Sequence, residues 1–279
     1  MGVVVRPAIA RVFAVVRRAW AVLAGCVLAC AGPPAVGPVD APAPRERRAE
    51  GTAAQAGRAA AEWRAAWEEL AGDPRFRATG CFASPEQLAA LTGDPIRHRA
   101  LTRADFRAAR RAARARLLVA MRDAVPEAYV ATSLVCLGRL RTEEPAPGRF
   151  AVWYDDLEYL ALVERDASWW NPRGRNEPEQ VLRHEQVHFD LTELVARRAN
   201  RRRGWHVAVT RFEADDPRAA MRGFAARWSA HMAALRAEWE ALQARYDRET
   251  RHGTLPAAQA EWVARVRREL AALPAVPSR

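Results

Sequence analysis

Lysine is absent from this chain, so its whole positive charge rests on arginine. Arginine contributes 44 positive charges against 33 negative charges from aspartate and glutamate, a formal net charge of +11 at pH 7. The arginines are scattered among acidic residues instead of forming one basic block, and alanine is also abundant, as expected of a GC-rich genome. An Arg-rich binder of nucleic acid or another anionic polymer is therefore the weakest functional hypothesis, and no nucleic-acid partner is expected.

Long uninterrupted hydrophobic segments are also missing. No apolar run reaches the roughly 18 residues of a membrane-spanning helix, which excludes a polytopic membrane protein. Half of the 279 residues are nevertheless hydrophobic, so a disordered chain is excluded as well. Beyond the N-terminal segment described next, roughly 250 residues remain, enough for one large domain or two small ones with a hydrophobic core.

Residues 1–30 have the layout of an export signal. Residues 1–18 carry four arginines and no acidic residue, and residues 19–29 (AWAVLAGCVLA) are apolar and uncharged, which is typical of a secretory signal. The sequence LAGC, ending at Cys26, resembles a bacterial lipobox, in which the cysteine becomes lipid-modified; VLAC, ending at Cys30, is a poorer second match. We predict a lipoprotein of the bacterial cell envelope, exposed to the periplasm or the cell exterior. The alternative is an uncleaved N-terminal anchor helix.

The rest of the chain divides into three parts. Residues 31–50 are rich in proline and alanine, which predicts a flexible tether between the lipid anchor and a folded domain. Residues 51–98 have tryptophan and leucine at helical spacing, which predicts a helical N-terminal extension. Residues 99–272 are expected to form the main domain.

Only two cysteines lie outside the signal, Cys81 and Cys136. In an oxidising envelope compartment, two remaining cysteines are a candidate disulfide. We predict that they are bonded to each other, the alternative being two buried free thiols.

The main domain changes from strand-forming to helix-forming residues along its length. Residues 128–137, 150–154 and 158–163 are rich in valine and aromatic residues, which predicts strands. Residues 141–149, with two prolines and a glycine, are expected to be the loop between the first two strands. From about residue 176 onward the periodicity is helical. The predicted fold class is α+β, with a small, mainly antiparallel sheet followed by long helices.

The first of these helices carries the motif HEQVH, an HExxH pattern, at residues 184–188. Helical spacing makes His184 and His188 neighbours on one inward face, about 40° apart around the axis. Two imidazoles one turn apart can bind one Zn²⁺ ion, and Glu185, about 100° round from His184, can reach the attacking water without being a ligand. The pattern predicts one zinc ion per chain, with Glu185 as the general base of a hydrolysis. The alternatives are two hydrogen-bonded core histidines, or a metal site without catalysis.

A catalytic zinc site needs a third protein ligand, usually downstream. The later histidines are His206, His231 and His252. His231 lies on the apolar stripe of a helix predicted over residues 217–250, where a lone histidine is more often a core residue. His252 lies in the polar cluster YDRETRHG, where Asp247 could be a ligand itself or could orient a ligating imidazole. On the residues alone, the third ligand stays open between His252, Asp247 and His231.

Two segments together suggest a family. HEQVHFD (His184–Asp190), followed far downstream by YDRETRHG (Tyr246–Gly253), resembles the predicted secreted zinc-dependent proteases of bacteria, a family catalogued largely as a domain of unknown function. Weaker matches are LTRADF at residues 101–106, a Ser-Trp pair at residues 168–169 and Trp262, so the resemblance covers roughly residues 100–265. The chain departs from the family pattern at Arg103, where a tryptophan is usual, and at Val187, where a small residue is usual.

The resemblance implies a zincin-like fold and metallopeptidase activity. It implies His184, His188 and His252 as zinc ligands and Glu185 as the base. Tyr246 and Asp247 then orient a ligand or replace one.

The leading hypothesis is a lipid-anchored zinc metallopeptidase of the bacterial envelope. Its partners would be a peptide or protein substrate and, through the N-terminal lipid, the membrane. The alternative is a non-catalytic envelope lipoprotein that keeps the fold as a binding or structural module. Glu185 favours the enzyme, because a purely structural zinc site has no need of a base.

Overall fold

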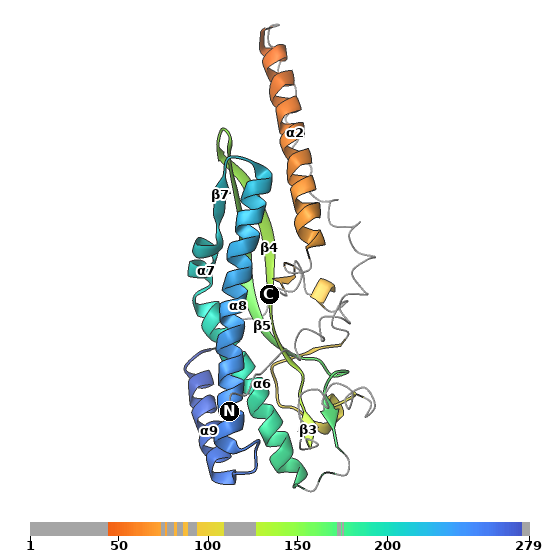
Figure 1. The fold of residues 1–279 in the computed structure, drawn as a ribbon, viewed down its shortest axis with the longest axis vertical. Helices are drawn as coiled ribbons and strands as arrows, with labels where there is room; N and C mark the ends of the chain where they lie inside the picture. Colours follow the sequence, from red (N-terminus) through yellow and green to blue (C-terminus); the bar gives the residue numbers. More distant parts are fainter. Residues whose placement is uncertain are drawn as a thin grey trace, which may run out of the picture.

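The protein is described by a computed structural model that covers residues 44–73, 76, 81–82, 86–88, 94–108, 127–171, 174 and 176–274. It has the α+β class predicted from the sequence, with a small mixed sheet and several long helices (Figure 1). The predicted signal, with Cys26 and Cys30, lies outside the described residues. The described elements are α2 (Pro44–Gly72), β1 (Cys81–Phe82), β2 (Ile96–Arg97), the 3₁₀ helix η2 (Arg103–Asp105), β3 (Ala128–Tyr129), β4 (Thr132–Ala146), β5 (Arg149–Val163), β6 (Trp169–Trp170), α6 (Pro178–Arg201), α7 (Arg203–Thr210), β7 (Phe212–Ala214), α8 (Pro217–Thr250) and α9 (Pro256–Ala271).

A long hairpin forms the middle of the sheet. β4 and β5 pair antiparallel from Thr132↔Val163 to Ala146↔Arg149. β1 pairs parallel to β4, whereas β2 and β7 pair antiparallel to the two ends of β5. β3 and β6 form a separate two-stranded antiparallel ribbon. The sheet is therefore mixed, with antiparallel pairs in the majority, rather than purely antiparallel.

The predicted loop over residues 141–149 is wrong in extent. β4 continues to Ala146 and β5 begins at Arg149, so the two strands are joined by a tight turn. Pro145 is tolerated in β4 because it falls in an irregular stretch of the ladder, between the pairs Glu143↔Ala151 and Ala146↔Arg149. Its missing N–H therefore removes no ladder hydrogen bond.

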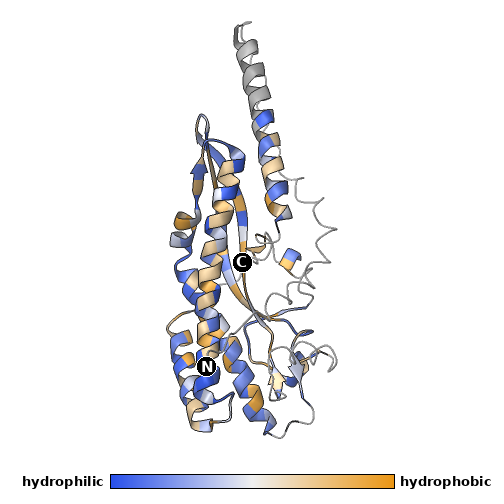
Figure 2. Cartoon of the chain, in the orientation of Figure 1, coloured by the Kyte–Doolittle hydropathy of each residue, from blue (hydrophilic) through white to orange (hydrophobic). Residues whose placement is uncertain are grey.

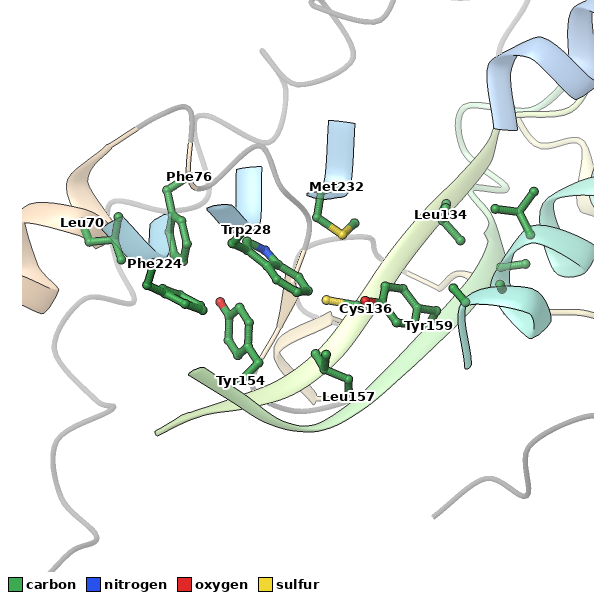
Figure 3. Packing of buried hydrophobic residues seen from close by; sticks show 14 of the residues in the cluster. Leu70, Phe76, Leu134, Cys136, Tyr154, Leu157, Tyr159, Phe224, Trp228 and Met232 are labelled. Carbon is green, nitrogen blue, oxygen red and sulfur yellow. The ribbon is translucent and has the colours of Figure 1, made fainter. Parts of the chain in front are cut away.

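The main core lies where α6 and α8 pack against the hairpin. Figure 3 shows Tyr154 of β5 beside Phe224 and Trp228 of α8. The ring centroid of Tyr154 lies 5.2 Å from that of Phe224 and 4.7 Å from that of Trp228. A second cluster, which includes Tyr246 and Trp262, joins α9 to α6 and α8. These contacts fix α6 and the C-terminal half of α8 side by side, and that pair of helices carries the candidate site.

The N-terminal extension shares the main core. Leu70 of α2 is buried in the core, and Trp63 packs edge-on against Phe150 with ring centroids 5.8 Å apart. A disulfide joins Cys81 of β1 to Cys136 of β4, and the two cysteines are register partners in the sheet. α2 begins at Pro44, so residues 44–50, expected to belong to the tether, are helical.

Within the described part of the chain, no helix combines the length and the hydrophobicity that crossing a membrane requires. Figure 2 shows hydrophilic residues interspersed with hydrophobic ones along these helices.

Candidate metal centre

The HExxH motif lies in the N-terminal half of α6. Pro178 begins the helix, at a position where a backbone N–H would have no partner within the helix, and Glu179 places a negative charge near the positive N-terminus. His184 and Glu185 are buried, and His188 is partly buried. As expected for residues one turn apart, the Nε2 atoms of His184 and His188 lie 3.2 Å apart.

Asp247 of α8 completes a group of three donor atoms. Its Oδ1 lies 3.1 Å from Nε2 of His188 and 3.4 Å from Nε2 of His184. In a tetrahedral zinc site with bonds of about 2.0–2.1 Å, neighbouring donor atoms are about 3.3–3.4 Å apart. The three atoms therefore form a triangle close in size to one face of a zinc tetrahedron. Over the described ranges, this is the one group of three histidine, cysteine or acidic side chains whose donor atoms lie so close together.

The hydrogen bonding and charge of the three donors favour binding of a cation. Oδ1 of Asp247 is buried, yet no described group gives it a well-oriented hydrogen bond. Burial opposes ionisation of Asp247, but the imidazoles of His184 and His188 hold its pKa well below the usual range. Burial also opposes protonation of His188, but Asp247, Glu185 and Gln243 raise its pKa to about 9. The same two carboxylates that favour a proton on His188 would favour a divalent cation.

Glu185 is held by the backbone that follows β3. Its Oε2 accepts a 2.9 Å hydrogen bond from the amide N–H of Val130. The carboxylate lies close enough to His188 to raise the pKa of that histidine, but it is not among the three close donors. A general base needs this position, beside the metal ligands without being one of them.

Gln243 fixes the protonation of His188. Its Oε1 lies 2.5 Å from Nδ1 of His188, and its Nε2 donates to the backbone oxygen of His188 at 2.9 Å and to Oγ1 of Thr192 at 3.1 Å. Because the amide nitrogen is engaged as a donor, the amide oxygen must accept, so Nδ1 carries the proton. A cation bound by His188 would replace the second proton of the ring, the one on Nε2, which is the nitrogen that faces Asp247. Gln243 is not among the residues predicted from the sequence, although it lies one helical turn before Asp247 on the same face of α8.

Two residues of the YDRETRHG segment enclose the ring of His184. The ring of Tyr246 stacks on it with centroids 4.8 Å apart, and the Tyr246 hydroxyl donates to the His184 backbone oxygen at 3.4 Å. Burial and nearby carboxylates raise the pKa of Tyr246 far above its usual value, so the hydroxyl stays protonated. Gly253 lies against the same ring: a Cβ atom there would stand 2.9 Å from Cγ and Nδ1 of His184. Tyr246 therefore orients His184 and directs its own hydroxyl to the backbone.

The other candidate ligands lie farther from the motif. Nδ1 of His252 is 3.5 Å from Oδ1 of Asp247, but the His252 side chain is 64% exposed and is not part of the close group. His206 is buried and His231 is partly buried, and each lies 2.9 Å from the hydroxyl of Tyr159. The structure thus brings Asp247 to the motif, places His252 at its rim, and leaves His231 in a separate hydrogen-bonded cluster.

Comparison of the chain with protein-family models, curated proteins and solved structures finds no match to any of them.

Proposed function

We propose that this chain is a zinc-dependent metallopeptidase in which His184, His188 and Asp247 hold one Zn²⁺ ion. The observation that carries the proposal is the triangle of donor atoms 3.1–3.4 Å apart, with the Glu185 carboxylate beside it. Two imidazoles and one carboxylate are a donor set that catalytic zinc sites use, with the fourth position left for water or substrate. The likeness of HEQVHFD and YDRETRHG to secreted zinc-dependent proteases of a zincin-like fold supports the same conclusion.

Each residue of the site has a distinct task in peptide hydrolysis. A bound Zn²⁺ ion would lower the pKa of water and polarise the scissile carbonyl. Glu185 takes the proton from the attacking water and passes it to the leaving amine nitrogen, so that the C–N bond breaks and a new C–O bond forms. The N–H of Val130 fixes one oxygen of Glu185, which limits the orientations of the base. Gln243 keeps the proton of His188 on Nδ1.

We also propose that the enzyme is a lipid-anchored protein of the bacterial envelope. The support is the arginine-then-apolar order of residues 1–29 and the LAGC sequence at Cys26. Cys26→Ser should release the protein from the membrane fraction. Release by Cys30→Ser alone would move the lipid to Cys30, and retention of both variants would contradict the lipoprotein proposal.

Zinc content and hydrolysis, measured on the same preparations, test the enzymatic proposal. Wild-type protein should hold about one zinc ion per chain and cleave a fluorescently labelled unfolded protein, and a chelator should abolish the cleavage. Glu185→Gln keeps the size of the side chain but removes the base, so zinc should stay while the rate falls about 100- to 10,000-fold. His184→Ala should lose both the bound zinc and the cleavage activity. A wild-type protein without zinc would contradict the proposal, and zinc without cleavage of any peptide tested would favour the non-catalytic module.

A matched pair of variants decides the third ligand. Asp247→Ala should empty the site, because two histidines on one helix leave the metal under-coordinated. His252→Ala should keep the metal, because its exposed side chain lies outside the triangle. Full zinc in Asp247→Ala together with loss of zinc in His252→Ala would assign the ligand to His252, as the family resemblance implies.

A further inference from the structure

The outer face of α7 exposes large hydrophobic side chains. Trp205 is 60% exposed and Val209, one turn later on the same face, is 38% exposed. The inner face is buried through His206 and Thr210. In Figure 1, α7 lies at the margin of the molecule, on the outside of the hairpin. A tryptophan with this much exposed surface is unusual for a side chain whose role is packing.

The exposed face is presented by a firmly held helix. Nδ1 of His206 lies 2.9 Å from the hydroxyl of Tyr159 in β5, and the two rings pack edge-on with centroids 5.2 Å apart. Among described aromatic side chains, the ring of Trp205 contacts only the ring of His206, at a centroid distance of 5.3 Å. Trp205 is therefore held outward by a helix whose other side belongs to the core.

Three consecutive arginines adjoin this face. Arg201, Arg202 and Arg203 are exposed where α6 meets α7, and none forms an ion pair within the described part of the chain. The acids around the end of α6 are paired with other arginines: Glu193 with Arg197, and Glu238 and Glu269 with Arg198. The patch therefore combines an unneutralised charge of about +3 with an aromatic ring and an aliphatic side chain.

We propose that this patch, Arg201–Arg203 with Trp205 and Val209, docks on the surface of a bilayer that contains anionic phospholipid. Arginines bind the phosphates of the headgroups, and a tryptophan ring is most stable at the level of the headgroups, with its apolar part toward the acyl chains. Val209 adds apolar surface that lipid covers but that offers nothing to a polyanion. The patch lies on the outer face of a helix, not in a groove. Proteins that bind single-stranded nucleic acid use a groove that follows the nucleic-acid backbone. Bilayer docking is independent of the proposed peptidase activity.

Tryptophan quenching by brominated phosphatidylcholine tests the docking. The full chain is bound to vesicles of phosphatidylcholine alone or mixed with phosphatidylglycerol, and the contribution of Trp205 is the difference between wild type and Trp205→Ser. This contribution should be strong with phosphatidylglycerol, weak without it, and reduced by salt. Because a basic residue near an anionic surface strengthens binding about fivefold, changing all three arginines to Gln should lower the docked-to-free ratio roughly 100-fold.

A control variant removes the same charge elsewhere. Arg222, Arg267 and Arg268 are exposed and form no ion pair with a described residue, so changing all three to Gln loses three charges without touching α7. The control should keep the Trp205 signal. Equal loss in both triple variants would overturn the proposal, as would a Trp205 signal that is the same with and without phosphatidylglycerol. Quenching of Trp205 by a single-stranded oligonucleotide but not by brominated vesicles would assign the patch to nucleic acid and also overturn it.

Discussion

Gly253→Ala should weaken the proposed zinc site although it changes none of the proposed ligands. Gly253 has φ of +78°, in the left-handed region where an alanine costs roughly 1–2 kcal/mol. The new Cβ atom would also stand 2.9 Å from Cγ and Nδ1 of His184, whereas ordinary contacts begin at 3.4 Å. Either the loop or the imidazole must therefore move by about 0.5 Å. Zinc–ligand distances tolerate only about 0.2 Å.

The imidazole has little room to yield. Tyr246 stacks on the His184 ring at 4.8 Å, and the backbone of His184 is fixed within α6. We therefore expect the crowding to cost about 1–3 kcal/mol beyond the backbone strain. We also expect zinc affinity to fall about 10- to 100-fold, the loss typical when the support of a ligand is disturbed.

Gly148→Ala is the matched control. Gly148 has φ of +72°, nearly the same as Gly253, but it lies in the β4–β5 turn with nothing within 4 Å of an added Cβ atom. Zinc affinity from chelator competition and the free energy of unfolding in denaturant should both be measured on the two variants. Gly148→Ala should show the backbone cost alone and wild-type zinc affinity. Equal zinc affinity in the two variants would refute the idea that Gly253 holds His184 in place.

Three further predictions concern stability. Burial opposes ionisation of Asp105, but a bidentate hydrogen bond from Arg99 lowers its pKa to about 2, below the unfolded value of about 3.9. Asp105→Asn should therefore lower the free energy of unfolding by about 2 kcal/mol at pH 7. A difference in stability between wild type and variant that does not shrink as the pH falls from about 4 to 2 would contradict this. Burial lowers the pKa of His206 to about 4, below the unfolded value of about 6.5. The free energy of unfolding, measured in urea titrations, should therefore fall by about 3 kcal/mol as the pH falls from about 6.5 to 4, and His206→Gln should reduce this pH dependence. Cys81 and Cys136 close a loop with a sequence separation of 55, and replacing both by Ser should lower the free energy of unfolding in denaturant by about 4 kcal/mol. Two free thiols in the wild type, found by labelling without reductant, would contradict the disulfide.

The elements of the fold were predictable where local pattern decides them. The spacing of apolar residues located α6 and α8, and the aromatic and β-branched residues located the sheet. The joins between strands were not predictable, because a proline usually marks a loop. Pro145 escapes that rule only through an irregularity in the ladder between the pairs Glu143↔Ala151 and Ala146↔Arg149. Pairing of β1 with β4 is non-local, and no short-range pattern in the sequence specifies it.

The candidate site divides in the same way. His184, Glu185 and His188 follow from the spacing of one helix, whereas the third ligand depends on how α8 lies against α6. Asp247 and His252 differ by five positions, but α8 ends at Thr250, and both Arg251 and His252 have positive φ. That turn leaves the His252 side chain at the surface while Asp247, still helical, faces the motif. The left-handed conformation of two successive non-glycine residues cannot be inferred from their sequence.

The HEQVHFD segment contains residues that zinc chemistry does not require, and the structure gives Gln186 and Asp190 another role. Oε1 of Gln186 accepts a 2.6 Å hydrogen bond from the backbone N–H of Leu101, and Asp190 lies 2.8 Å from Nε2 of His98. Nε2 of Gln186 also donates to Asp190 at 2.7 Å, so the two side chains act together on the segment between β2 and η2. The helix therefore uses one face for the three donor atoms and the neighbouring face to hold the preceding chain. Similarity over all seven residues is therefore evidence for a shared fold as much as for a shared reaction. The zinc content and hydrolysis rate of Glu185→Gln test the reaction separately from the fold.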